Sequence, residues 1–161
     1  MTDWIDVIVI TALTLAAATT GGIFKPGPFY DSLEKPSWTP PDWAFPVVWS
    51  ILYVMIAIAG WMVWEVRGFS MVMGVWAAQL VLNALWSYLA FGQRRFDWAF
   101  YEVVLLWLSV ALFIVLAWPA SPMAALLFLP YLVWVSLAAV LNYSVWSLNP
   151  KRAAGVLSQD V

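Results

Sequence analysis

Five stretches of the sequence are each long and apolar enough to cross a lipid bilayer as a helix. The hydrocarbon core of a bilayer requires about 20 consecutive, mostly apolar residues in helical form. The stretches that meet this requirement are residues 4–23, 45–64, 70–91, 98–118 and 123–146. The sequence therefore predicts an all-α integral membrane protein, in which residues 1–161 form one domain, a five-transmembrane-helix bundle.

The composition supports this class and excludes several functions. Hydrophobic residues make up 65% of the chain and charged residues 10%, whereas a soluble domain carries about a quarter charged residues. The net charge of −2 and the lack of a basic stripe argue against nucleic-acid binding. The chain has no cysteine and no histidine, which excludes disulfides, thiol nucleophiles and the usual zinc sites. We therefore expect no metal site, no catalytic residues and no cofactor.

Prolines interrupt the sequence at two informative places. The segment between the first two spans contains five of them, so it cannot be helical throughout. We expect a proline-rich loop between helices 1 and 2, lying over the mouth of the bundle. Pro130 lies inside the fifth span, where it removes a helix hydrogen bond and is expected to kink the helix.

The positions of the basic residues predict an orientation. With five spans, the loops between spans 1 and 2 and between spans 3 and 4 share one side of the membrane with the carboxyl terminus. That side holds Lys25, Lys35, Arg94, Arg95, Lys151 and Arg152, and the other side holds Arg67. The positive-inside rule then places the carboxyl terminus in the cytoplasm and the amino terminus outside. Helical spans and this asymmetry favour a bacterial inner membrane, with an outer membrane as the alternative.

Three spans carry stripes of polar or aromatic side chains at i, i+4 spacing, which places each stripe on one helix face. The stripes are Trp49, Tyr53 and Ala57; Gln79, Asn83 and Ser87; and Trp134, Ala138 and Asn142. These faces are expected to point inward, because an unpaired amide in hydrocarbon costs several kcal/mol. For Gln79 and Ser87 we favour hydrogen bonds between helices. For Asn83 and Asn142, such bonds and contact with a ligand are equally supported.

Tryptophan is unusually abundant, with 13 residues. An interfacial belt explains those at the span ends, but Trp49, Trp86 and Trp134 share inward faces with polar groups. Rigid aromatic walls beside a few polar groups are typical of a small-molecule pocket.

Glu102, one turn into the fourth span, is either functional or complements the helix dipole, and we favour the dipole.

Five segments carry a family pattern, in register along the whole chain. They are Tyr30–Pro41, Val48–Tyr53, Leu82–Gly92, Leu129–Trp134 and Ala138–Tyr143. They resemble the first loop and the second, third and fifth helices of the translocator protein family, also called tryptophan-rich sensory proteins or peripheral-type benzodiazepine receptors, and the chain looks like a bacterial member. The resemblance implies a five-helix bundle, usually a homodimer, whose first loop lids a pocket open to the cytoplasm.

The resemblance also implies ligands and the residues that bind them. Family members bind porphyrins such as protoporphyrin IX, isoquinoline-carboxamides and benzodiazepines. By matching motifs, the pocket has walls of Trp49, Tyr53, Trp86 and Trp134, with Asn83 and Ala138 alongside and with Tyr30 and Trp38 closing it. Asn142, from the stripe of the fifth span, completes the candidate ligand-binding residues.

The residues support the porphyrin that the resemblance implies and favour a metal-free one, bound as a ligand rather than as a cofactor. Indole rings favour a flat conjugated ring, and the chain lacks histidine and cysteine as axial ligands for haem iron. The propionates are expected to reach Lys35, Arg94 or Arg95. Sterol binding is not expected, because Ser147 stands where the cholesterol-recognition segment of animal members requires a basic residue.

Three functions remain open from the sequence. The first, which we favour, is a membrane receptor or carrier involved in tetrapyrrole transport, sensing or stress regulation. The second is light-dependent porphyrin degradation, as the resemblance reports for some bacterial members, with Trp49 and Trp134 at the implicated positions. The third is a structural membrane subunit whose aromatic residues pack against partner helices.

Overall fold

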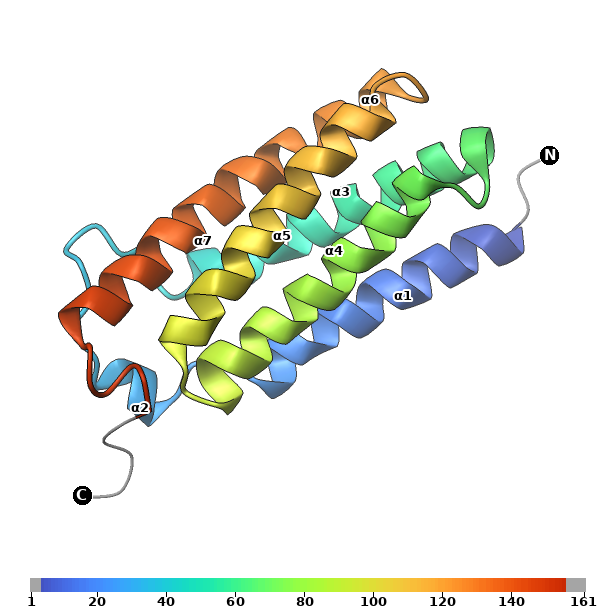
Figure 1. Ribbon diagram of the computed structural model, residues 1–161. Helices are drawn as coiled ribbons and strands as arrows, with labels where there is room; N and C mark the ends of the chain where they lie inside the picture. The colour runs from blue at the N-terminus through green and yellow to red at the C-terminus, as the bar shows by residue number, and fades with distance from the viewer. Residues whose placement is uncertain (1–3, 156–161) are drawn as a thin grey trace.

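The computed structural model describes residues 4–155, and these residues form an elongated bundle of long helices (Figure 1). The helices are α1 (Trp4–Ile23), α2 (Pro28–Asp31), α3 (Ala44–Arg67), α4 (Met71–Ser87), the π-helix η1 (Tyr88–Gly92), α5 (Phe96–Ala117), α6 (Pro122–Leu127) and α7 (Leu129–Leu148). Taken together as spans, they give five helical segments that are long and apolar enough to cross a membrane. The predicted all-α, five-span architecture is confirmed, with each predicted bound within three residues of the observed one.

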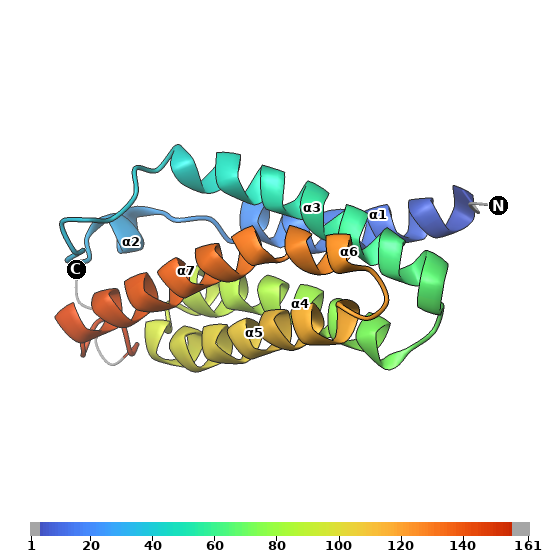
Figure 2. The same cartoon turned by 90° about the horizontal axis from the view of Figure 1, so that it is seen from above.

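The central helix of the bundle is α4, which packs against α1, α3 and α5. On one side α5 packs against α6 and α7, and on the other α3 packs against α1 and α6. Figure 2 shows that α3 and α7 separate toward the end of the bundle where α2 lies, while α3 stays close to α6 at the opposite end. The bundle is therefore closed at the α6 end and splayed at the α2 end.

The linker between α1 and α3 is largely non-helical, as its prolines predict, with α2 as a single short helical turn. Hydrogen bonds fix it to the chain after α7. The Glu34 N–H donates to Asn149 Oδ1 at 3.0 Å, and Asn149 Nδ2 donates to the Glu34 carbonyl at 2.9 Å. Arg152 donates to both the carbonyl and the hydroxyl oxygen of Ser32. The linker is thereby held at the splayed end of the bundle (Figure 2).

Two helices depart from α-helical geometry. The fifth span is interrupted at Phe128, between α6 and α7, and Pro130 lies in the first turn of α7. The interruption lies two residues before Pro130, the residue from which a kink was predicted. The third span ends in η1, where the N–H of Gln93 donates to the carbonyl of Tyr88 at 2.8 Å. Nothing in the sequence analysis predicted this wider turn.

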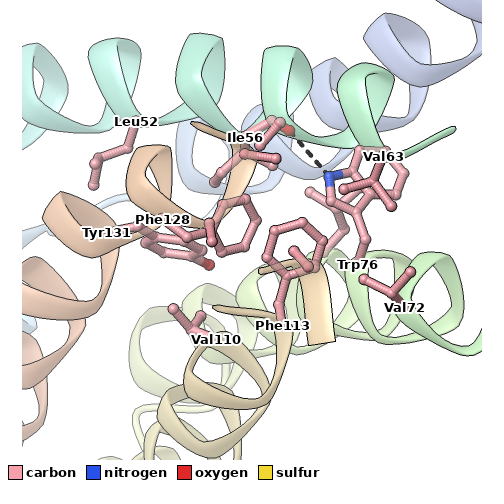
Figure 3. Close-up of a cluster of buried hydrophobic side chains, with 14 of the residues drawn as sticks. Leu52, Ile56, Val63, Val72, Trp76, Val110, Phe113, Phe128 and Tyr131 are labelled. Atoms are coloured by element: carbon pink, nitrogen blue, oxygen red, sulfur yellow. Dashed lines mark hydrogen bonds between the residues drawn. The ribbon is translucent and has the colours of Figure 1, made fainter. Parts of the chain in front are cut away.

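The core at the closed end is built around an indole and a glycine. Trp76 of α4 is buried and donates its Nε1–H to the Ile56 carbonyl of α3 at 3.0 Å (Figure 3). The indole fits against α3 because Gly60 has no side chain, and a Cβ there would overlap the ring of Trp76. Phe113 and Phe128 stack beside them, with ring centroids 3.9 Å apart.

We predict that Gly60→Ala lowers the midpoint of thermal unfolding in detergent. The added methyl group must displace an indole that is both buried and hydrogen-bonded, and overpacking of this kind costs about 1–3 kcal/mol. The matched control is Gly74→Ala on α4, where a Cβ meets nothing within 4 Å. Equal midpoints for the two variants would show that the contact between Gly60 and Trp76 does not limit stability.

Candidate ligand site

Aromatic side chains from α3 and α7 meet where these two helices begin to separate. The rings of Trp49 and Tyr53 stack with centroids 5.5 Å apart, and Trp49 also meets Tyr131 of α7 edge to face at 6.1 Å. Phe45 and Trp134 form a second edge-to-face contact, at 5.7 Å. Since residues four apart share a helix face, the i, i+4 stripe of α3 brings Trp49 and Tyr53 to the inner side together.

A chain of hydrogen bonds runs beneath these rings and joins three helices. The Tyr53 hydroxyl donates to Asn83 Oδ1 at 2.5 Å, and Asn83 Nδ2 donates to the Tyr131 hydroxyl oxygen at 3.1 Å. The Tyr131 hydroxyl in turn donates to Gln79 Oε1 at 2.9 Å. Asn83, Gln79 and Tyr131 are buried. Each of these three bonds therefore runs between two helices, and α3, α4 and α7 are linked at membrane depth.

A second polar connection joins α4, α5 and α7 closer to the splayed end. Trp86 Nε1 donates to Asn142 Oδ1 at 3.2 Å, and Asn142 Nδ2 donates to the Phe96 carbonyl at 2.7 Å. Asn142 is buried, while Trp86 is half-buried. The Trp86 indole is therefore only partly covered, and it lies beside an amide whose oxygen and nitrogen both have hydrogen-bond partners.

Tyr30 of α2 joins the site through aromatic contacts. Its ring meets Phe91 edge to face at 5.5 Å and stacks on Phe96 at 5.9 Å, and Phe91 meets Trp86 at 5.6 Å. Burial, followed by the nearby carboxylates Asp42 and Asp31, raises the pKa of the Tyr30 phenol above its ordinary value. The Tyr30 side chain is thus a neutral ring packed against Phe91 and Phe96.

The candidate residues from the sequence fall into three groups. Trp49, Tyr53 and Asn83 lie together around Tyr131, and Trp86 with Asn142 lies nearer the splayed end, where Phe91 connects Tyr30 to Trp86. Ala138 is half-buried on α7, between Trp134 and Asn142 in sequence. Trp38 lies apart. Its side chain is 45% exposed, and within residues 4–155 no hydrogen bond or ring contact joins it to the others.

The sequence analysis missed residues that the site depends on. Tyr131 is fully buried and bonds to two side chains of α4, and Phe45, Phe91 and Phe96 supply rings. The available signal for Tyr131 was its position three residues before Trp134, one helix turn away on the same face. Gln79 does bond between helices, as we favoured.

Glu102 does not occupy the position that the sequence analysis favoured. Because α5 begins at Phe96, Glu102 lies beyond the first helical turn, where the helix dipole has its effect. Asp97 occupies that first turn instead and forms an ion pair with Arg95 at 2.6 Å. The Glu102 side chain is 5% exposed and points into the bundle.

A larger groove lies on the outer face between α5 and α7. It has a volume of about 400 Å³ and is lined by Phe100, Val104, Trp107, Tyr143 and their neighbours. Its one hydroxyl besides Tyr143, that of Ser136, already accepts from Trp107 Nε1 and donates to the Leu132 carbonyl. An open apolar groove of this kind lacks polar groups to orient a ligand, so we place the candidate site inside the bundle.

The fold and the site define a class: a multi-pass helical membrane protein with a polar interior between aromatic walls. The sequence matches the model of the TspO/MBR family over residues 9–147, and the chain belongs to this family. It is 46% identical over 141 residues to Protein CrtK of Rhodobacter capsulatus, covering 83% of this chain and 86% of that protein. It is 37% identical over 150 residues to the Tryptophan-rich sensory protein of Cereibacter sphaeroides, covering 93% and 95%. The resemblance inferred from the sequence is confirmed.

The similarity extends to animal proteins. The chain is 42% identical over 133 residues to the Translocator protein of Sus scrofa, covering 79% of this chain and 78% of that protein. The names of these relatives describe a translocator and a sensory protein rather than an enzyme of a common class.

We predict that Tyr131→Phe destabilises the bundle more than Tyr143→Phe. Removing the Tyr131 hydroxyl breaks two hydrogen bonds and leaves an amide donor on Asn83 and an amide acceptor on Gln79 unpaired. Interhelical hydrogen bonds in membranes contribute about 0.6–1.7 kcal/mol each. Tyr143 is 52% exposed and serves as the control. Thermal unfolding in detergent measures the stability of both variants. Equal midpoints would contradict the stabilising role of the hydrogen bonds among Tyr53, Asn83, Tyr131 and Gln79.

Proposed function

We propose that the protein is a membrane receptor or carrier that binds porphyrins such as protoporphyrin IX, and isoquinoline-carboxamide or benzodiazepine-type ligands, between α3, α4 and α7. One observation supports this above the others. Half-buried rings of Trp49, Tyr53, Trp86 and Trp134 surround buried amides at the depth where α3 and α7 separate. Such a combination suits a large flat apolar ligand with a few polar atoms.

Basic side chains at the splayed end support a porphyrin with its propionates directed outward. A cleft of about 160 Å³ lies beside Tyr30, lined among others by Lys25, Phe91 and Arg94. The Lys35 ammonium lies 4.7 Å from the centre of the Tyr30 ring. A porphyrin stacked in the site would extend its carboxylates toward these charges, and both carboxylates would meet water rather than hydrocarbon.

The charge asymmetry supports the remaining parts of the proposal. The splayed end, with the linker and the end of α7, faces the cytoplasm, and the start of α1 faces the opposite side. We place the protein in a bacterial inner membrane as a homodimer, as the family resemblance implies. A ligand would then enter from the cytoplasm and be sensed or carried as part of tetrapyrrole regulation.

We predict that protoporphyrin IX quenches the tryptophan fluorescence of the purified protein in the dark, without forming a product. Trp134→Phe should weaken the affinity about 2- to 10-fold, because an aromatic contact contributes about 0.5–1.5 kcal/mol. Trp118→Phe is the control, since Trp118 is exposed beyond the end of α5. Arg94→Ala should weaken binding of the porphyrin but not of its dimethyl ester. Absence of quenching, together with no rise in the melting temperature on adding ligand, would favour the structural-subunit alternative.

The second candidate function, light-dependent porphyrin degradation, is favoured by the surroundings of Trp49. Its indole contacts both Tyr53 and Tyr131, so three oxidisable rings lie together in the site. If this function holds, illumination of the complex yields a new absorbing product that Trp49→Phe and Trp134→Phe abolish and Trp118→Phe does not. Spectra of free porphyrin under the same light provide the control, because porphyrin is itself a photosensitiser. Equal product with and without protein would count against it.

A further inference from the structure

Glu102 is an acid buried in a membrane-spanning helix with no partner. Its side chain is 5% exposed, and neither carboxyl oxygen has a hydrogen-bond partner among residues 4–155. Burying an isolated ionised carboxylate costs far more than burying the neutral acid. The group is therefore held as a carboxylic acid, with one O–H donor. Ionisable residues within membrane spans are rare, and they commonly mark a functional site.

The pairing of α5 with α7 fixes the height of Glu102 in the bundle. Trp107 of α5 bonds to Ser136 of α7, and the Phe96 carbonyl of α5 accepts from Asn142 of α7. Glu102 lies midway between Phe96 and Trp107, so it lies at the height of Ala138. Glu102 therefore borders the candidate ligand site from the α5 side.

Among the other polar groups of this site, the acceptor atoms have hydrogen-bond partners and some of the donor atoms do not. The side-chain amide oxygens of Gln79, Asn83 and Asn142 are all occupied, by Tyr131, Tyr53 and Trp86 respectively. Three buried side-chain N–H groups have no acceptor among the described residues: Trp61 Nε1 of α3 and, within the site, Gln79 Nε2 and Trp134 Nε1. The O–H of Glu102 adds a third unpaired donor to the site. Each amide oxygen of the site thus already accepts one hydrogen bond, while three donors have no partner among the described residues.

We propose that Glu102, as a neutral acid, donates its O–H to an acceptor atom of the bound ligand, and that the site selects flat apolar ligands that carry a carbonyl oxygen or an imine nitrogen on their buried side. This inference rests on the proposed ligand site between α3, α4 and α7. It explains why an acid is kept in the bundle without a partner: leaving a buried donor unpaired costs about 1–3 kcal/mol, and a ligand acceptor recovers it. Gln79 Nε2 and Trp134 Nε1 are further donors for acceptor atoms of the same ligand.

The test compares two substitutions at Glu102 in the full chain, in detergent or nanodiscs. Glu102→Gln keeps a neutral side chain with an N–H donor, whereas Glu102→Leu keeps the bulk and removes the donor. The probes are an isoquinoline tertiary carboxamide and its thioamide, which differ in one atom and in acceptor strength. Infrared spectroscopy of the ¹³C-labelled carbonyl reports the hydrogen bond directly. Glu65→Leu, exposed near the end of α3, is the control.

We expect the unsubstituted chain and Glu102→Gln to bind the carboxamide about tenfold more tightly than the thioamide, with the carbonyl stretch lowered in the complex. Glu102→Leu should bind both probes with about equal affinity and show no lowered stretch. Its melting temperature without ligand should be no lower than that of the unsubstituted chain, because a buried unpaired group has been removed; this confirms that it is folded.

Four results would overturn the inference. If Glu102→Leu keeps the preference for the carboxamide, Glu102 does not touch the acceptor. If Glu102→Gln loses as much affinity as Glu102→Leu, the group acts as a carboxylate rather than as a neutral donor. If the unsubstituted chain binds neither probe and no porphyrin, the proposed function fails and this inference fails with it. Binding with no difference between the probes overturns the inference alone.

Discussion

Hydrogen bonding in a core without water is the constraint on which the rest of this structure depends. Lipid tails are as apolar as leucine, so hydrophobic burial does not by itself decide which helices of a membrane bundle pack together. Side-chain hydrogen bonds do so here. Tyr131 reaches Asn83 and Gln79, Asn83 reaches Tyr53, and α3, α4 and α7 are held at one level. These hydrogen bonds thereby also determine where the aromatic side chains of α3 and α7 face each other.

The two ends of the bundle have different packing and support different roles. At the closed end, the Trp76 indole fills the space left by Gly60, and Phe113 stacks on Phe128, so the helices approach closely. At the splayed end, α3 and α7 separate (Figure 2), and the edge-to-face contact of Phe45 with Trp134 joins the two helices. A firmly packed base therefore lies below a mouth lined by aromatic side chains.

The sequence predicted most of the fold because membrane insertion imposes strong local rules. Span length fixed five helices, and the cost of exposing amides to lipid predicted that Gln79, Asn83 and Ser87 face inward, where all three are buried. Contacts between helices could not be predicted from such local rules. The hydrogen bonds of Tyr131 depend on which helices are neighbours, and the site of Glu102 depends on α5 beginning two residues earlier than its hydropathy indicated. The pairing of Asn149 with Glu34 joins segments 115 residues apart, beyond any local pattern.

The contacts that the aromatic rings already make with one another determine which interactions can contribute to ligand affinity. Phe45 already contacts Trp134, and Trp49 already contacts Tyr53 and Tyr131. A flat ligand entering here exchanges ring–ring contacts for ring–ligand contacts, so the protein itself gains little apolar burial and the driving force is the removal of the ligand's own surface from water. That term is similar for many flat molecules. Selectivity among them must therefore come from the few buried polar groups, which are fixed by hydrogen bonds between helices and cannot adapt as the rings can.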